Sequence, residues 1–397
     1  MRERATSGAL QALGPGRSWD GLVVVVAGVT WEGNRLGAQH IAERLTRWAP
    51  VLYVDPPRTP MSVRRKPWIA ESGREPRLRL VADRLARLTV MVPPLKSRPG
   101  GREVAERVLR HRVRGAVRAL GGSVRATVVI PPHYPAFHVG EALRVHLASD
   151  DFAAGAGIQG VSEAWVRRQE RRVARDADLV VAVSPVLQDK WRRLGTDPVL
   201  WTNGCDVDLM ARARTVRPAA DVALPQPVAG FMGTLSERTD VAWLEAVART
   251  GRSLLLVGPR SHTAPQQALD RVLAMPNVQW VGRRPHTEVP SYLAHMDVGL
   301  VPYADDAFNR ASFPLKVLDY LAAGLPVVAR DLPSVRWLGT DHTVLASDAG
   351  SFVAEAVRAM DAPVDHDAVA GRRAVAARHG WDARVAELAA LLGLPGA

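Results

Sequence analysis

Residues 312–330 read SFPLKVLDYLAAGLPVVAR, and this pattern predicts a loop, a short helix and a buried strand. Pro314 has a fixed φ and no N–H, which suits the first helical position, and it pushes Phe313 out of the α region to act as the cap. Gly324 ends the helix as a left-handed C-cap, and the short β-branched run at 327–329 is typical of a buried strand. The stretch predicts an αβ unit whose helix has a bare N-terminus near residue 314.

The predicted helix separates an apolar face from a polar one. Four apolar residues share one face, whereas Lys316 and Asp319, three positions apart, lie on another. Free amides at a bare helix N-terminus, with a lysine beside them, favour an anion such as a diphosphate, and a carboxylate one turn deeper can accept two hydroxyls of a ribose. An ordinary surface ion pair on a core helix is the alternative. The nucleotide interpretation assigns the site to Ser312, Phe313, Pro314, Leu315, Lys316 and Asp319.

The same residues resemble the donor-binding signature of GT-B glycosyltransferases of family four, the glycosyl transferases group 1, and are closest to a subgroup with Phe-Pro-Leu-Lys in the opening half. In that signature one acidic residue opens the motif and a second follows eight positions later. Asp319 falls at the second acidic position and Ala311 at the first. The resemblance covers roughly residues 21–390. It implies an α/β fold of the GT-B type, with two Rossmann-like parallel-sheet domains facing an interdomain cleft.

Length and composition set the broad class. At 397 residues the chain exceeds the size at which single cores stop growing, so two domains are expected. No run approaches about eighteen apolar residues, and residues 1–16 lack the apolar segment of a signal peptide. The single cysteine, Cys205, excludes an internal disulfide and a Cys-based metal cluster. We therefore expect a cytoplasmic protein.

The net charge of +12 is concentrated in the first half of the chain. Residues 1–215 hold 35 Lys and Arg against 21 Asp and Glu, and residues 64–125 alone hold 17 against 5. Such a patch fits anionic lipid headgroups, a phosphorylated acceptor or nucleic acid, or it is a solvated surface. Because no zinc-finger, RNP or KH signature accompanies the charge, no nucleic acid is expected. Peripheral contact with the inner face of a membrane through residues 64–125 stays open.

The first apolar run, residues 21–27, predicts a parallel strand buried on both faces. A loop containing Trp31 and Gly33 follows, and then a helix over 38–48. The spacing of the glycines does not fit Gly-x-Gly-x-x-Gly, so a classical NAD site is not expected. In the resembled family the equivalent loop faces the cleft, which implies that Gly33 contacts the donor and Trp31 lies on the acceptor side.

Two polar loops follow later strands. His133 comes directly after a predicted strand at 126–130, at the end of a parallel strand where α/β sheets bind ligands. In the resembled family a histidine at this place contacts the transferred sugar, so His133 is the predicted catalytic residue, with His138 a weaker candidate and an incidental loop histidine the alternative. Asp150 and Asp151 follow the next strand and could bind a metal, cap a helix or orient a hydroxyl. Without another carboxylate cluster at metal-ligand spacing, we expect an acceptor-side or capping role and no metal.

The second half alternates strands and helices from a strand at 228–232 to a strand at 326–329 and a terminal helix at 381–392. This alternation predicts a parallel sheet covered on both faces. The expected organisation is a flexible N-terminal tail, an acceptor domain, a linker, a nucleotide-sugar donor domain and a C-terminal helix that crosses back to the first domain, at 1–20, 21–208, 209–226, 227–375 and 376–397.

In the resembled family an arginine and a lysine after the first strand of the second domain neutralise the donor diphosphate. Gly233 and Arg238 stand in that segment here, and Arg284 lies in a loop that resembles the one that reads the base edge. Thr234 occupies the usual arginine position, so another arginine would have to compensate: Arg260 or Arg310.

These features predict a nucleotide-sugar-dependent glycosyltransferase of the hexosyltransferase type. The resemblance implies retention of anomeric configuration without a metal, no cofactor beyond the sugar donor, and an acceptor hydroxyl on a cell-surface glycan, a lipid-linked molecule or a natural product. Thr234 and Ala311 leave open a noncatalytic nucleotide-sugar-binding partner of another transferase. A GT-B nucleotide-sugar epimerase is less favoured, because its extra acid and histidine pattern is not evident.

Overall fold

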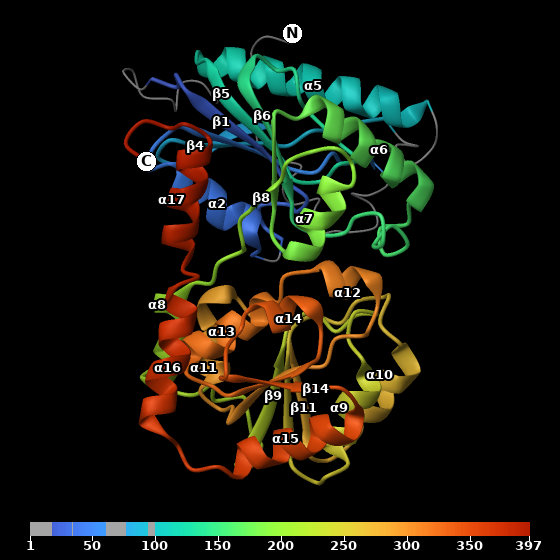
Figure 1. Cartoon of the computed structure of the whole chain (residues 1–397), viewed down its shortest axis with the longest axis vertical. Helices are drawn as coiled ribbons and strands as arrows, with labels where there is room; N and C mark the ends of the chain where they lie inside the picture. The colour runs from blue at the N-terminus through green and yellow to red at the C-terminus, as the bar shows by residue number, and fades with distance from the viewer. Residues whose placement is uncertain (1–17, 34, 61–76, 94–99) are drawn as a thin grey trace. The chain divides into compact units, whose positions relative to one another are not determined.

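The computed structural model describes residues 18–33, 35–60, 77–93 and 100–397. The predicted tail up to residue 17 lies outside these residues, as do 64–76 and 94–99 of the basic stretch at 64–125. The chain divides into two compact units (Figure 1). Unit 1 comprises residues up to Val183, Leu187–Trp201 and Val385–Ala397, and unit 2 comprises Ser184–Val186 and Thr202–Arg384. The described residues contain no helix with the length and hydropathy needed to cross a bilayer.

Unit 1 is built on an eight-stranded sheet in the order β3-β4-β2-β1-β5-β6-β7-β8. Its pairs are parallel except for the edge pair β3 and β4. The order reverses between β1 and β5, which makes their carboxyl ends the topological switch point. The strands are β1 (Leu22–Val26), β2 (Val51–Val54), β3 (Leu78–Ala82), β4 (Leu85–Leu88), β5 (Val124–Val129), β6 (Glu141–Ala148), β7 (Leu179–Ala182) and β8 (Val199–Leu200).

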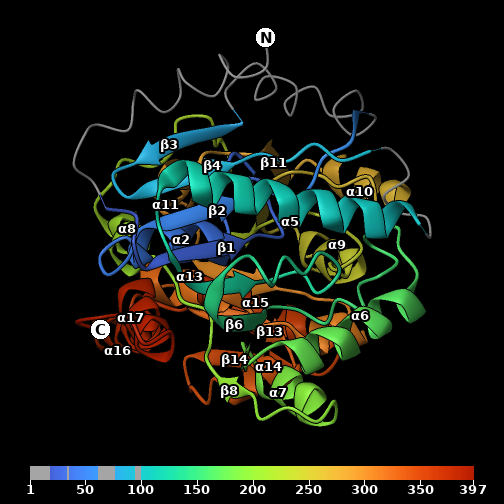
Figure 2. The ribbon, with the colours of Figure 1, turned by 90° about the horizontal axis from the view of Figure 1, so that it is seen from above.

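Four helices accompany this sheet, and their apolar faces explain where they lie. In α5 the buried residues recur at helical spacing, which directs one side of a long arginine-rich helix toward the core. Figure 2 shows α5 stretched across the unit with α6 beside it. The end of the chain also belongs to unit 1, because Arg125 Nε donates to the Leu392 carbonyl (3.1 Å). The helices are α2 (Gly37–Leu45), α5 (Gly101–Leu120), α6 (Glu163–Asp176) and α7 (Pro185–Arg192).

Unit 2 has a six-stranded, wholly parallel sheet in the order β11-β10-β9-β12-β13-β14. This order reverses between β9 and β12, as in the doubly wound mononucleotide-binding sheets. The strands are β9 (Val228–Met232), β10 (Ser253–Val257), β11 (Val278–Gly282), β12 (Val298–Val301), β13 (Val327–Arg330) and β14 (Thr343–Ala346).

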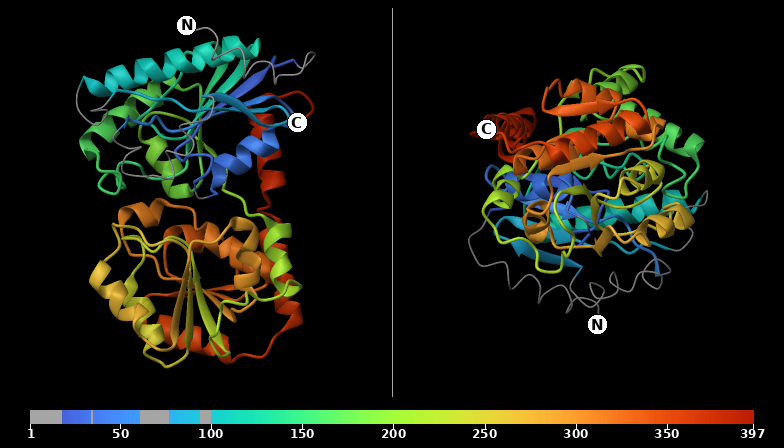
Figure 3. Two further views of the ribbon diagram at one scale, coloured as in Figure 1. Left: turned by 180° about the vertical axis from the view of Figure 1, so that it is seen from behind. Right: turned by 90° about the horizontal axis from the view of Figure 1, so that it is seen from below.

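The helices of unit 2 form two layers (Figure 3). One layer is α9 (Val241–Ala248), α10 (Gln266–Leu273) and α15 (Ala349–Asp361); the other is α8 (Val207–Ala211), α11 (Val289–Leu293), α13 (Leu315–Ala323) and α16 (His366–Ala377). Unit 2 also contains the short helices α12 (Ala307–Ala311) and α14 (Pro333–Trp337) and 3₁₀ turns at Arg212–Arg214 and His286–Glu288. Helix α17 (Trp381–Leu391) belongs to unit 1 from Val385 onward. The predicted parallel sheet with both faces covered is confirmed.

Two local features differ from what the sequence suggests. Strand β4 includes the charged Arg87, which lies inside the sheet at 1% exposure because the buried Asp55 accepts its hydrogen bond. Helix α13 begins at Leu315, and Pro314 rather than Phe313 occupies the cap position, with φ −83° and ψ 77°. The C-cap is as expected, since Gly324 is left-handed at φ 83°.

Tyr320 fixes α13 to the strands beneath it. Its hydroxyl accepts a hydrogen bond from the Met232 N–H (2.7 Å), and its ring lies against Gly299 of β12. A Cβ at Gly299 would stand 2.3 Å from Tyr320 Cγ, so only glycine leaves room for the ring. Since Lys316 and Asp319 lie on the same helix, this close approach sets their position over the sheet.

Gly299→Ala should lower the free energy of unfolding by about 2 to 3 kcal/mol, because a rigid ring cannot move aside in a packed core. Gly230→Ala is the matched control: Gly230 pairs with Gly299 in register, but its added Cβ meets the thioether of Met296, which is flexible. Urea denaturation of the full chain measures both, and an equal or smaller loss for Gly299→Ala would contradict this account of the packing.

Candidate functional site

The carboxyl ends of β9 and β12, at the switch point of unit 2, collect the polar residues predicted from the sequence. Gly233 directly follows β9 with φ 139°, a conformation that favours glycine, and its N–H donates to the Val257 carbonyl (2.7 Å). Tyr303 follows β12 by two residues. Ligands of doubly wound sheets bind at such a place.

Lys316 reaches this point from the first turn of α13. Its Nζ donates to the Tyr303 hydroxyl (2.7 Å) and lies 4.7 Å from the centre of the same ring and 5.4 Å from that of Phe231. A Cβ on Gly233 would fall 2.1 Å from Lys316 Cε, so the glycine makes room for the lysine. The structure therefore brings together the predicted Gly233 and Lys316, and it adds Tyr303, which sequence reasoning missed.

Arg238 is the second cation of the cluster. Its Nε donates to Asn309 Oδ1 (3.0 Å), its terminal nitrogen donates to Ser312 Oγ (3.1 Å), and the guanidinium stacks on Phe308 at 4.6 Å. Asn309 is 1% exposed, and its Nδ2 donates back to the Arg238 carbonyl (3.1 Å). Asn309 thus holds the arginine in one orientation. Nothing in the sequence around Asn309 signals this role.

Asp319 is partly buried one turn along α13. Loss of hydration raises its pKa to about 7; the charge of Lys316 lowers it and that of Asp206 raises it. No group in the described part of the chain hydrogen-bonds the Asp319 carboxylate. Because no described group occupies its oxygens, this carboxylate can accept hydrogen bonds from a ligand. Asp206, at the start of α8, is a second acidic neighbour that the sequence analysis did not select.

The start of α13 has fewer free N–H groups for an anion than the sequence predicted. Pro314 has no N–H, and the Leu315 N–H donates to the Phe313 carbonyl (3.0 Å). The prediction that free amides beginning near residue 313 hold a diphosphate is therefore wrong for Pro314 and Leu315, and the side chains of Lys316 and Arg238 supply the positive charge of the cluster. Ala311, in the place of the first acidic residue, is 1% exposed at the end of α12.

Three other predicted arginines are committed to neighbours of their own. Arg284 donates to Asp221 (2.5 Å) and to the Tyr292 hydroxyl. The two candidate replacements for the cation missing at Thr234 pair with acids: Arg260 with Asp270 (2.6 Å) and Arg310 with Asp305 (2.5 Å). In the described residues no contact joins any of these three arginines to Lys316, Arg238 or Asp319.

In unit 1 the predicted residues also gather near a switch point. The loop after β1 turns at Gly33, whose N–H donates to the Thr30 carbonyl (2.9 Å), and a Cβ there would approach that oxygen to 2.9 Å. The Trp31 N–H donates to Asp55 Oδ1 (3.0 Å), and its ring meets Tyr53 edge-on at 5.0 Å. Trp31 and Gly33 are thus held by the end of β2.

Asp55, which sequence reasoning missed, anchors this loop. It directly follows β2, is 0% exposed, and accepts hydrogen bonds from Arg87 Nε (2.8 Å) and Thr89 Oγ1 (3.0 Å). Arg87 also donates two short hydrogen bonds to the carboxylate of Glu32, which lies in the loop. An acid at the end of a second strand can hold a ribose in dinucleotide-binding folds, but here it is neutralised within the protein.

His133 follows β5 and is surrounded by aromatic rings. Its ring centre lies 4.8 Å from Tyr134, 5.7 Å from Phe152 and 6.0 Å from Trp165. Asp151, after β6, accepts from Lys190 Nζ (2.7 Å), which also donates to the buried Glu170 (2.6 Å). Asp150 accepts a bond from Ser149 (3.2 Å). His133 lies at the end of β5 as predicted, whereas Asp151 is bound in an internal ion pair.

Residues 226–362 match the family described as "Glycosyl transferases group 1". The chain is 32% identical over 179 residues to the putative teichuronic acid biosynthesis glycosyltransferase TuaH of Bacillus subtilis, covering 43% of this chain and 44% of that protein. It is 29% identical over 238 residues to a GDP-mannose-dependent alpha-mannosyltransferase of Mycobacterium tuberculosis, covering 57% and 59%. The chain thus spans about half the length of the curated relatives it matches.

Solved structures match almost the whole chain. Sucrose-phosphate synthase from Thermosynechococcus elongatus is 17% identical with a TM-score of 0.71 over 94% of this chain and 98% of that one. HepE of Anabaena, solved in complex with UDP and glucose, is 14% identical with a TM-score of 0.65 over 94% and 99%. These likenesses show the fold, which is GT-B. The resemblance to group 1 glycosyltransferases recognised from the sequence is confirmed over residues 226–362, while the assignment to the Phe-Pro-Leu-Lys subgroup stays a prediction.

Asp55→Asn should lower the free energy of unfolding by about 3 to 5 kcal/mol, because it removes the fully buried charge partner of Arg87 and leaves the guanidinium only the exposed carboxylate of Glu32. Asp189→Asn is the matched control, since Asp189 pairs with Arg192 on the surface and should cost less than about 1 kcal/mol. Denaturant unfolding of the two variants measures the difference. A loss for Asp55→Asn no larger than that of the control would show that this ion pair does not hold the loop.

Proposed function

We propose that this protein is a nucleotide-sugar-dependent glycosyltransferase that moves a sugar from a nucleoside diphosphate to an acceptor hydroxyl. The observation that carries the proposal is the cluster at the switch point of unit 2, where Lys316 lies over Gly233 and Arg238 is fixed beside Ser312. The family match over residues 226–362, which include this cluster, supports the assignment. The names of the two curated relatives, both of them glycosyltransferases, support it as well.

The proposed chemistry is the stabilisation of a leaving group. Departure of a nucleoside diphosphate builds negative charge, and fixed cations lower the barrier when they need no reorganisation as that charge develops. Lys316 is held by the Tyr303 hydroxyl and Arg238 by Asn309 and Ser312, so both are oriented before a ligand arrives. In this proposal the two side chains neutralise the diphosphate without a metal, and Asp319 accepts the hydroxyls of the ribose.

The finer assignments concern the donor sugar and the acceptor. We propose retention of anomeric configuration, as the family resemblance implies, with His133 contacting the transferred sugar. We also propose that unit 1 serves the acceptor through the loop of Trp31 and the segment of Asp150 and Asp151. A cell-surface glycan is the preferred acceptor class, and the assignment of TuaH to teichuronic acid biosynthesis supports this choice. A thermal-shift screen of UDP, GDP, dTDP and CDP would identify the base, because a bound nucleotide raises the melting temperature.

Nucleotide affinity should depend on pH through Asp319. Its pKa is raised to about 7, so the carboxylate that accepts the ribose hydroxyls is present above that pH and is lost by protonation below it. Affinity in the wild type should therefore fall by up to about tenfold for each pH unit below the pKa. Isothermal titration calorimetry with the nucleotide found in the screen measures this. Asp319→Asn should bind weakly with no such dependence, and an equally steep pH profile in that variant would refute the role of Asp319.

A second experiment should distinguish the roles of the two units. His133→Ala should abolish donor hydrolysis and transfer, because the histidine contacts the sugar, while leaving the affinity for the free nucleotide within about twofold. Lys316→Met should weaken nucleotide binding by about tenfold or more, since it removes a charge-assisted contact to phosphate. Binding without turnover of any donor in the wild type would instead favour the noncatalytic partner. Loss of nucleotide binding in His133→Ala would contradict the division of roles.

A further inference from the structure

Helices α5 and α6 of unit 1 lie side by side and are joined by specific contacts. Figures 1 and 2 show the two helices as neighbours. Both terminal nitrogens of Arg172 on α6 donate to Glu106 on α5 at 2.9 Å. Arg102, at the start of α5, stacks 4.0 Å from the centre of Trp165, in the first turn of α6. The two helices therefore form one surface layer, and their faces opposite the core are turned to solvent.

This layer is strongly basic, and most of its excess charge is not neutralised. The two helices carry eleven arginines and five acidic residues. Arg110, Arg167 and Arg172 pair with acids on the same two helices. Six other arginines are exposed and form no hydrogen bond or ion pair through their side chains with the rest of the described chain. We name these six the α5–α6 face: Arg107, Arg112, Arg118, Arg168, Arg171 and Arg175.

The spacing of these arginines turns them outward. Arg168, Arg171 and Arg175 recur at three and four residues and so share one side of α6. The buried residues of α6, such as Val166 and Val173, occupy the opposite side. A row of three cations with no acidic residue between them on the same side gives a locally uniform positive potential.

Apolar side chains stand at one end of the face. Val104, in the first turn of α5, is 41% exposed, and Ile158, in the loop that leads into α6, is 39% exposed. With Leu36 they are the large hydrophobic residues exposed on the described part of unit 1, and none of the three is aromatic. Cations beside exposed aliphatic groups suit the boundary between headgroups and acyl chains, whereas single-stranded nucleic acid is bound on aromatic platforms.

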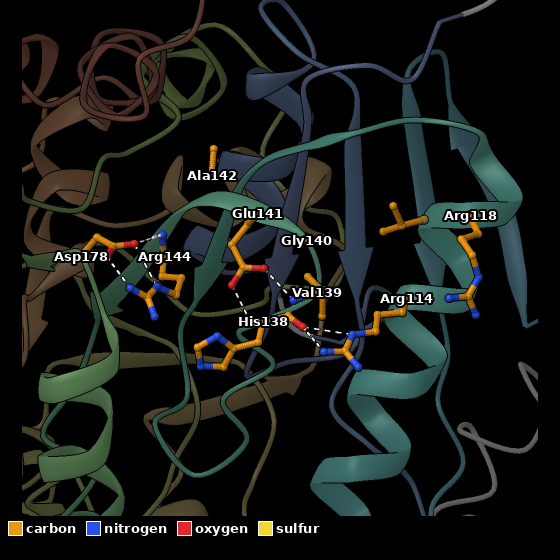
Figure 4. A pocket seen from close by; sticks show the side chains of 10 residues that line it. Arg114, Arg118, His138, Val139, Gly140, Glu141, Ala142, Arg144 and Asp178 are labelled. Carbon is orange, nitrogen blue, oxygen red and sulfur yellow. Dashed lines mark hydrogen bonds and ion pairs between the residues drawn. The ribbon is translucent and has the colours of Figure 1, made fainter.

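A pocket of about 650 Å³ adjoins the C-terminal part of α5 (Figure 4). Its acidic residues are engaged: Glu141 accepts from the N–H groups of His138 and Val139 (2.6 Å each), and Asp178 accepts from Arg144 (2.6 Å). Arg114, also in the wall, donates to the His138 carbonyl (3.0 Å). Arg118, a member of the α5–α6 face, lines the same pocket and has no such partner among the described residues.

We propose that the α5–α6 face docks on an anionic lipid bilayer. The cations face the headgroups, Val104 and Ile158 enter the boundary with the acyl chains, and the pocket beside Arg118 receives one headgroup phosphate. The sequence suggested membrane contact through residues 64–125, and the structure moves its centre to α5 and adds α6. Docking requires no nucleotide, so its test stands apart from that of the transferase.

The test is co-sedimentation of the full chain with vesicles in the absence of nucleotide. The protein should bind mixed vesicles made of equal parts phosphatidylglycerol and phosphatidylcholine, and it should bind vesicles of pure phosphatidylcholine far less. Added salt should release the protein, because it shortens the range of the electrostatic attraction. Because each arginine near an anionic surface contributes about fivefold, the triple variant Arg168→Gln, Arg171→Gln, Arg175→Gln should lower the partition coefficient by about 100-fold.

A matched triple variant in unit 2 controls for net charge. Arg214→Gln, Arg217→Gln, Arg378→Gln removes three exposed arginines with no side-chain partner in the described chain and should change the partition coefficient by less than about threefold. Far-UV circular dichroism checks that both triple variants are folded. Equal binding to neutral and anionic vesicles, or equal losses in the two triples, would overturn the proposal. Displacement of the protein from vesicles by duplex RNA that binds more tightly would overturn it too and assign the face to nucleic acid.

Discussion

The contact between Lys316 and Gly233 is the constraint on which the candidate site depends. The lysine reaches across the end of β9 only because residue 233 has no side chain, and it stays there because the Tyr303 hydroxyl accepts a hydrogen bond from its ammonium group. That contact requires α13 to lie close to the sheet, which Tyr320 against Gly299 secures. Two strands, β9 and β12, and one helix are thus tied to the position of a single ammonium group. The residues that hold it in place, Gly299, Tyr303 and Tyr320, are buried in the fold.

The fold was largely predictable because its signals are local. Continuous apolar runs such as Val23–Val26 identify strands buried on both faces, and Gly324 marks the end of α13 through its left-handed conformation. The antiparallel pairing of β3 with β4 and the strand after β13 were harder to predict from the sequence. Residues 343–346 form only a short edge strand with two half-buried or exposed side chains, so their pattern is weak. Where a buried charge interrupts a strand, as Arg87 does in β4, hydrophobic periodicity fails altogether.

The candidate site was predictable in part, for the same reason. Lys316 and Asp319 are three residues apart on one helix, so their sequence spacing states their geometry. Tyr303 and Asn309 act on Lys316 and Arg238 from other elements, and no spacing links them. Asp55 is a comparable case in unit 1, since its partner Arg87 lies 32 residues away in another strand. Residues that position a functional group across the chain become visible only when the fold is known.

The arrangement around Ala311 explains how the site can tolerate a missing acid. Ala311 is almost fully buried, and the nearby arginine, Arg238, is already satisfied by the neutral oxygens of Asn309 and Ser312. An additional carboxylate there would compete for that guanidinium or be buried without a partner, at a cost of several kcal/mol. With neutral partners the guanidinium keeps its full positive charge for a ligand. Among the described residues no carboxylate pairs with Arg238, which favours the binding of a polyanion such as a diphosphate.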